Sequence, residues 1–128
     1  MSALHPLEFE LPSVEYREVP RARAAARGWC RAAGLNGVTE AVLLVLTELL
    51  GNAVCHARTP VTVRLEATPT VVRIEVSDGS PDRPTRRSAG SGESDGRGLA
   101  IVDALTARHW GSERSAHGKL VWAEVARH

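Results

Sequence analysis

The sequence predicts a two-layer α+β sandwich, in which a mostly antiparallel sheet carries helices on one face. Residues 20–33 and 38–57 place apolar side chains at three- and four-residue spacing, which is typical of amphipathic helices. Residues 61–67 and 70–77 instead alternate apolar and polar side chains and are separated by a short turn, which is typical of a hairpin with one buried face.

Length and composition indicate a single globular domain that spans residues 1–128, with a core over about 20–126. A hydrophobic content of 43% and a charged content of 24% are ordinary, and this length can bury a core without disulfides or metals. The net charge of +1 gives no support for a nucleic-acid or membrane partner. No signal peptide opens the chain, and the longest apolar run, 41–46, is too short to cross a bilayer, so we expect a cytoplasmic protein.

The first third of the chain is expected to hold an edge strand and a helix. Leu7–Leu11 lies between two prolines, and Pro20 suits the first turn of a helix that ends near Gly34. The apolar stripe of this helix is expected to comprise Ala22, Ala25, Ala26, Trp29, Cys30 and Ala33. Its other side carries arginines, which we interpret as a solvated face and as the best candidate surface for an acidic partner: Arg23, Arg27 and Arg31.

The second helix should begin with Asn36 as its cap and end before Pro60. Its buried sector is expected to comprise Val42, Val45, Leu46, Leu49, Ala53 and Ala57. Cys30 and Cys55, which lie within the two predicted helices, show no metal-ligand spacing and are expected to be reduced thiols.

The second half of the chain combines a long loop, a short helix and a strand pair. Prolines, glycines and a lack of apolar side chains predict a long mobile loop over residues 80–95, and loops of this length are usually functional or disordered. A short amphipathic helix should follow from Gly96 to Leu105, and strands are expected over 108–114 and 119–126.

A polar stripe on the second helix is the first candidate for chemistry. Glu48, Asn52 and His56 are four residues apart and therefore share one edge of an otherwise apolar helix. A polyphosphate with magnesium would partner them, because an amide oxygen suits a hard cation and a carboxylate can deprotonate a hydroxyl. Gly51 would give close access beside this stripe at a cost in helix stability. The alternative is that the polar edge faces water.

Two short segments complete the candidate site. Asp78-Gly79 follows a predicted strand, where it could form a turn or accept a hydrogen bond from the 6-amino group of adenine. Gly96-Arg97-Gly98 lies at the predicted junction of loop and helix, where backbone amides and the helix dipole favour phosphate. The lysine and hydroxyl residue of a Walker motif are absent from this segment.

In this order, the segments resemble the boxes of the ATPase superfamily shared by gyrase, histidine kinases and mismatch-repair proteins. Val45–Ala57 looks like the N box, Ile74–Gly79 the G1 box and Gly96–Val102 the G2 box. Thr47-Glu48 with Asn52-Ala53 and His56 is similar to the N box of bacterial anti-sigma-factor serine/threonine kinases, and Gly118–Trp122 is similar to their closing strand.

The resemblance implies the histidine-kinase-like ATPase fold and a protein serine/threonine kinase that uses ATP and Mg²⁺. By this similarity Glu48 is the general base, Asn52 binds magnesium and Asp78 with Gly79 binds adenine. The phosphates would be bordered, beneath an ATP lid at about 82–95, by Gly96, Arg97, Gly98 and Leu99. Such a protein sequesters a sigma factor and phosphorylates a small anti-anti-sigma antagonist on serine, and it can form a homodimer.

Two departures from the family pattern leave other functions open. The G1 box is usually Asp-x-Gly-x-Gly, whereas this chain has Asp78-Gly79-Ser80-Pro81, and a threonine expected near Leu120 is absent. A non-catalytic interaction module with the same fold and weak or no nucleotide binding is therefore the main alternative. A histidine-kinase fragment is disfavoured because no phospho-acceptor hairpin precedes residue 20, and DNA binding is disfavoured because no aromatics accompany the candidate arginines, Arg83, Arg86 and Arg87.

Overall fold

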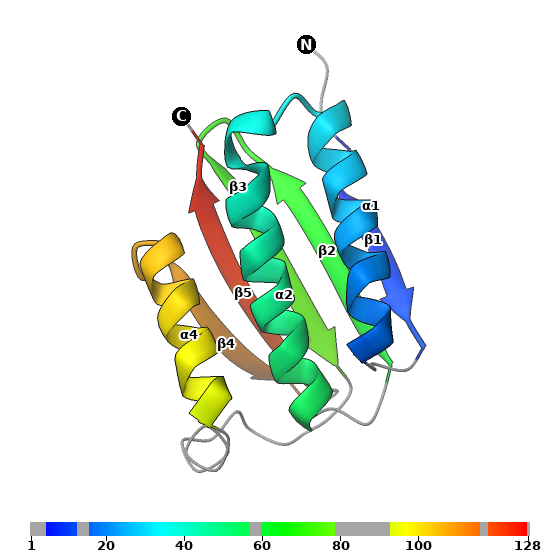
Figure 1. Ribbon diagram of the computed structural model, residues 1–128, viewed down its shortest axis with the longest axis vertical. Helices are drawn as coiled ribbons and strands as arrows, with labels where there is room; N and C mark the ends of the chain where they lie inside the picture. The colour runs from blue at the N-terminus through cyan, green and yellow to red at the C-terminus, as the bar shows by residue number, and fades with distance from the viewer. Residues whose placement is uncertain (1–4, 13–15, 57–59, 79–92, 116–117, 128) are drawn as a thin grey trace.

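The computed structural model describes residues 5–12, 16–56, 60–78, 93–115 and 118–127. In this part of the chain, a five-stranded antiparallel sheet forms one layer and three α-helices cover one of its faces (Figure 1). The structure therefore confirms the predicted α+β sandwich.

The sheet has the strand order β1-β2-β3-β5-β4, and every neighbouring pair is antiparallel. The strands are β1 (Leu7–Leu11), β2 (Val61–Ala67), β3 (Val71–Asp78), β4 (Trp110–Ser115) and β5 (Gly118–Ala126). The first two match their predicted bounds, because prolines and strict alternation mark them in the sequence. The third runs one residue later than expected, so Asp78 is its last residue and does not follow it.

The three helices lie side by side across the sheet. They are α1 (Val19–Ala32), α2 (Thr39–His56) and α4 (Glu93–Leu105), and short 3₁₀ turns, Tyr16–Glu18 and Asn36–Val38, precede the first two. Gly34 ends α1 as predicted: its φ of +73° lets the backbone N–H of Leu35 donate to the carbonyl of Cys30 at 2.8 Å.

Asn36 does not cap α2, contrary to the sequence prediction. It opens the 3₁₀ turn, and α2 begins three residues later at Thr39, whose Oγ1 donates to the carbonyl of Leu35 at 2.9 Å. The extra turn separates the asparagine from the free amides that it would have to reach in order to cap α2.

Helix α4 begins at Glu93, three residues before the predicted start at Gly96. Acidic residues favour the first turn of a helix, and Glu93 and Asp95 supply two of them, whereas the two glycines beyond suggested a breaker. The last three residues of the predicted lid, 93–95, are therefore helical, and the rest of the lid falls on 79–92, outside the described residues.

The core lies between the sheet and α2, the central helix of Figure 1. The residues that were predicted to form the buried sector of α2 lie in this core, except Ala57, which is outside the described residues. Leu43 and Leu50 of α2 are buried there as well. Helix α1 contributes Ala22, Ala26 and Cys30, whereas Ala25 is exposed because it points away from α2 and the sheet, contrary to the prediction.

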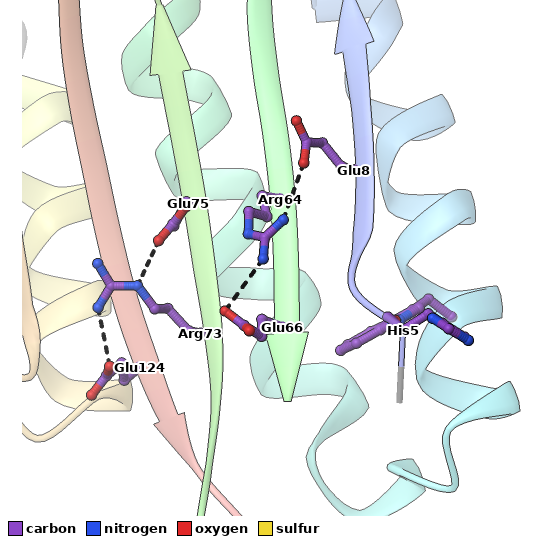
Figure 2. Close-up of polar contacts among 8 residues, drawn as sticks. His5, Glu8, Arg64, Glu66, Arg73, Glu75 and Glu124 are labelled. Carbon is purple, nitrogen blue, oxygen red and sulfur yellow. Dashed lines mark hydrogen bonds and ion pairs between the residues drawn. The ribbon is translucent and has the colours of Figure 1, made fainter. Parts of the chain in front are cut away.

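The opposite face of the sheet is polar. Arg64 forms ion pairs with Glu8 at 3.1 Å and with Glu66 at 3.6 Å. Arg73 bonds Glu75 at 2.7 Å and Glu124 at 3.1 Å, and its guanidinium lies 4.6 Å from the centre of the Trp122 ring. Figure 2 shows these ion pairs in front of the sheet, with the helices behind it. The apolar and polar sides of the strands are thus divided as their alternation predicts.

Candidate functional site

The polar stripe of α2 lies on the C-terminal half of that helix. Glu48 and Asn52 are both half-buried, while their neighbours Leu49, Leu50 and Ala53 are buried in the core. Four residues of helix place the two polar side chains one turn, or about 6 Å of rise, apart on one edge. The stripe therefore borders the core. The side chain of His56 lies outside the described residues.

Asp78 ends β3 and lies on the side of the sheet that the helices cover. Alternation places it on the same side as the buried residues Ile74 and Val76. It pairs in register with Val61 of β2 and with Lys119 of β5, and it is half-buried. Helix α2 packs against β3. Gly79 is outside the described residues.

The predicted phosphate segment lies in the first two turns of α4. The backbone of Gly96, Arg97, Gly98 and Leu99 is helical, and the structure describes no side chain before Leu99. The free amides of this helix end belong to the first turn, so Gly98 and Leu99 lie beyond them. At the other end of α4, Trp110 Nε1 donates to Asp103 Oδ1 at 3.0 Å and ties the helix to β4.

Three segments that are far apart in the sequence meet at one end of the molecule. Figure 1 shows the C-terminal end of α2, the C-terminal end of β3 and the N-terminal end of α4 at the lower end of the view. Helix α2 packs against α4 as well as against β3. The structure therefore brings the α2 stripe, Asp78 and the start of α4 to the same end of the molecule.

An open pocket of about 360 Å³ lies at this end of the molecule. Two of its lining residues, Arg114 and Lys119, are not among the site residues that the sequence predicts. Lys119 of β5 pairs in register with Asp78 of β3 on one side and with Arg114 of β4 on the other, so the three residues form a row across the sheet. Leu120, where a hydroxyl was expected, pairs with Ser77 on the opposite side of the sheet. The residue beside Asp78 is therefore Lys119, which is 4% exposed.

The described residues include no group of three or more His, Cys, Asp or Glu that could hold a metal ion. Glu48 and Asn52 offer oxygen ligands, and a magnesium ion would need further oxygens, which phosphates provide. Arg114 and Lys119 add positive charge beside Asp78. These oxygen ligands and positive charges together suit a polyanion that binds as its magnesium complex.

Two of the three arginines of the predicted surface on α1 form contacts with residues of α2. Arg23 Nη1 donates to Thr47 Oγ1 at 2.7 Å, and Arg27 Nη1 pairs with Glu40 Oε2 at 2.9 Å. Both contacts join α1 to α2, which leaves Arg31 as the exposed member of the predicted surface. The arginines considered for DNA binding, Arg83, Arg86 and Arg87, lie outside the described residues.

Cys30 is an enclosed thiol between α1 and α2. Burial raises its pKa, and a hydrogen bond with Thr39 and the positive charge of Arg27 offset only part of this effect. The thiol is therefore protonated at neutral pH, which fits the reduced structural cysteine that the sequence predicts.

None of the helices in the described ranges is long and apolar enough to pass through a membrane.

Comparison with known protein families gives a match over residues 13–125. The matching family is described as "Histidine kinase-like ATPase domain". No curated protein matches the chain.

Proposed function

The chain belongs to the histidine kinase-like ATPase family, and we propose that it is a regulatory protein that binds ATP between α2, α4 and the ends of β3 and β5. The observation that carries this proposal is the meeting of the α2 stripe, Asp78 and the start of α4 at one end of the molecule. A charged stripe at the edge of an apolar core is costly without partners, and a bound nucleotide would provide them.

The residues present fit ATP with magnesium. Asn52 would bind the metal through its amide oxygen, and Asp78 would accept a hydrogen bond from the 6-amino group of adenine. The backbone from Gly79 and from Gly96 to Leu99 would border the nucleotide, with the free amides of the first turn of α4 facing its phosphates. Bound ATP supplies a phosphoryl group for transfer.

We further propose that the protein is a serine/threonine kinase of the anti-sigma-factor type. Glu48, half-buried and one helical turn from Asn52, would accept the proton of a serine hydroxyl on a small antagonist protein. The same chain would sequester a sigma factor in the cytoplasm, as a homodimer. The resemblance of the N box supports this function, whereas the altered G1 box supports a non-catalytic module with the same fold.

The experiment that tests ATP binding is a magnesium-dependent titration of Asn52→Ala. The amide oxygen is the magnesium ligand in this proposal, so the variant should lose the part of the ATP affinity that depends on magnesium. Asn36→Ala is the matched control, because Asn36 is exposed in the 3₁₀ turn before α2 and should bind ATP as the wild type does. Unchanged magnesium dependence in Asn52→Ala would refute the site.

Kinase function is tested by purifying the protein with its partners from the native cell and adding ATP labelled at the γ-phosphate. We expect a sigma factor or a small antagonist to be recovered, and the antagonist to be labelled on serine. Recovery of these partners without label would instead support the non-catalytic module. Recovery of neither partner class would refute the anti-sigma function.

A further inference from the structure

Lys119 occupies an unusual position in the sheet. It is the single lysine of the sequence, and only 4% of its surface is exposed. It pairs directly with Asp78 across β3 and β5, and alternation places it on the same side of the sheet as the buried residues Val121 and Ala123. Directly opposite residues hold their Cβ atoms about 5 Å apart, so the two side chains leave the sheet side by side.

Lys119 lines the pocket at this end of the molecule together with Asp78. Among the described residues, the structure gives its ammonium group no hydrogen bond or ion pair. The described part of the chain also contains no side-chain nitrogen that is fully enclosed and without a partner. The Lys119 nitrogen therefore keeps contact with the pocket, as a donor in a largely buried side chain.

The two side chains together can recognise a donor and an acceptor that are adjacent on one ligand. An ionised carboxylate only accepts hydrogen bonds, and an ammonium group only donates them. Adenine presents this arrangement on one edge, where the 6-amino group donates and the neighbouring ring nitrogen N1 accepts. In the same orientation, guanine would present an acceptor to Asp78 and a donor to Lys119, so both contacts would be repulsive.

We propose that Lys119 is a second base-recognition residue, whose ammonium donates a hydrogen bond to N1 of the adenine that Asp78 binds through its 6-amino group. This inference rests on the proposed function and adds the group that selects adenine over guanine. A charged donor makes a stronger hydrogen bond than a neutral one, so its loss should reduce affinity by about 10-fold to 100-fold.

The test compares ATP with 1-deaza-ATP, in which a C–H group replaces N1, by calorimetry. The wild type should bind the analogue about 10-fold to 100-fold more weakly than ATP. Lys119→Met keeps an unbranched apolar side chain but has no donor, so it should bind both nucleotides equally weakly. Lys119→Gln retains a donor and should recover part of the preference for ATP.

Arg114→Met is the matched control, because Arg114 lies opposite Lys119 on β4 and lines the same pocket. It removes a positive charge from the same row, and it should preserve the ratio of the two affinities. Thermal unfolding of each variant separates a loss of folding from a loss of recognition.

The possible failures are distinguishable. Equal binding of ATP and 1-deaza-ATP by the wild type would overturn the role of Lys119 while the proposed function stands. The same conclusion would follow if Lys119→Met lowered the melting temperature but kept the wild-type ratio, since Lys119 would then be structural. A wild type that bound neither nucleotide would instead refute the proposed function itself.

Discussion

Gly51 lies in the middle of α2, beside the polar stripe, where a glycine weakens the helix. A Cβ built at this position meets no heavy atom within 4 Å, so the fold itself does not require the glycine. Replacing glycine by alanine inside a helix stabilises it by about 1 kcal/mol. Gly51→Ala should therefore raise the melting temperature by about 3–5 °C in a domain of this size.

The same substitution should weaken ATP binding if the nucleotide approaches this helix closely. An added methyl group that meets a bound ligand costs about 1–3 kcal/mol, which corresponds to about 5-fold to 150-fold in affinity. The assay is thermal unfolding of the free protein combined with calorimetric titration of ATP. We expect the variant to be more stable and to bind ATP more weakly.

Gly28 provides the matched control within the same chain. It is an exposed glycine inside α1, and a Cβ there also meets no heavy atom within 4 Å. Helix α1 lies on the far side of α2 from α4, away from the proposed site (Figure 1). Gly28→Ala should give a similar stabilisation with unchanged ATP affinity. If both variants bind ATP like the wild type, the argument that the nucleotide lies against Gly51 is refuted.

Three further predictions address catalysis, a buried thiol and the core. Glu48→Gln should retain ATP binding but lose phosphotransfer by about two orders of magnitude, measured with labelled ATP, and an equal loss of binding would make Glu48 structural. Burial raises the pKa of Cys30, so the stability that the protonated thiol contributes is present at neutral pH and is lost as the pH rises through that pKa. In a Cys55→Ser background, alkylation of Cys30 should therefore be slow at every pH below its pKa. Rapid alkylation at neutral pH would contradict the burial of this thiol. Leu46→Ala, at a fully buried position, should cost about 2–5 kcal/mol in denaturant unfolding, whereas Leu44→Ala, at a position 39% exposed, should cost far less, and equal costs would refute the packing.

Local sequence signals predict the elements of this fold well where a single physical cause dominates. Prolines and strict alternation predict the bounds of β1 and β2, and Gly34 ends α1 because its backbone adopts a positive φ. The start of α4 is harder to predict, because its two early glycines favour a helix end whereas its acidic first turn favours a helix start. The exposure of Ala25 is also hard to predict, because alanine fits a buried or an exposed helix face equally well.

The sequence predicts which segments contribute to the candidate site, but it does not predict which of their residues lie next to one another. Glu48 and Asn52 share a face because of the helical period, which the sequence contains. The pairing of Asp78 with Lys119 depends on β5 inserting between β3 and β4, which is a property of the whole sheet. A lone lysine in an arginine-rich chain was the one local signal at that position.

The central claim is that this chain binds ATP with the carboxylate of Asp78 on the adenine. Calorimetric titration of ATP, with and without magnesium, into the wild type and the isosteric variant Asp78→Asn tests it most directly. The account predicts one ATP per chain, tighter binding with magnesium and at least about tenfold weaker binding to the variant, because the neutral amide oxygen of asparagine accepts a weaker hydrogen bond than the charged carboxylate. Absence of binding to the wild type, or equal affinities of the two proteins, would contradict it.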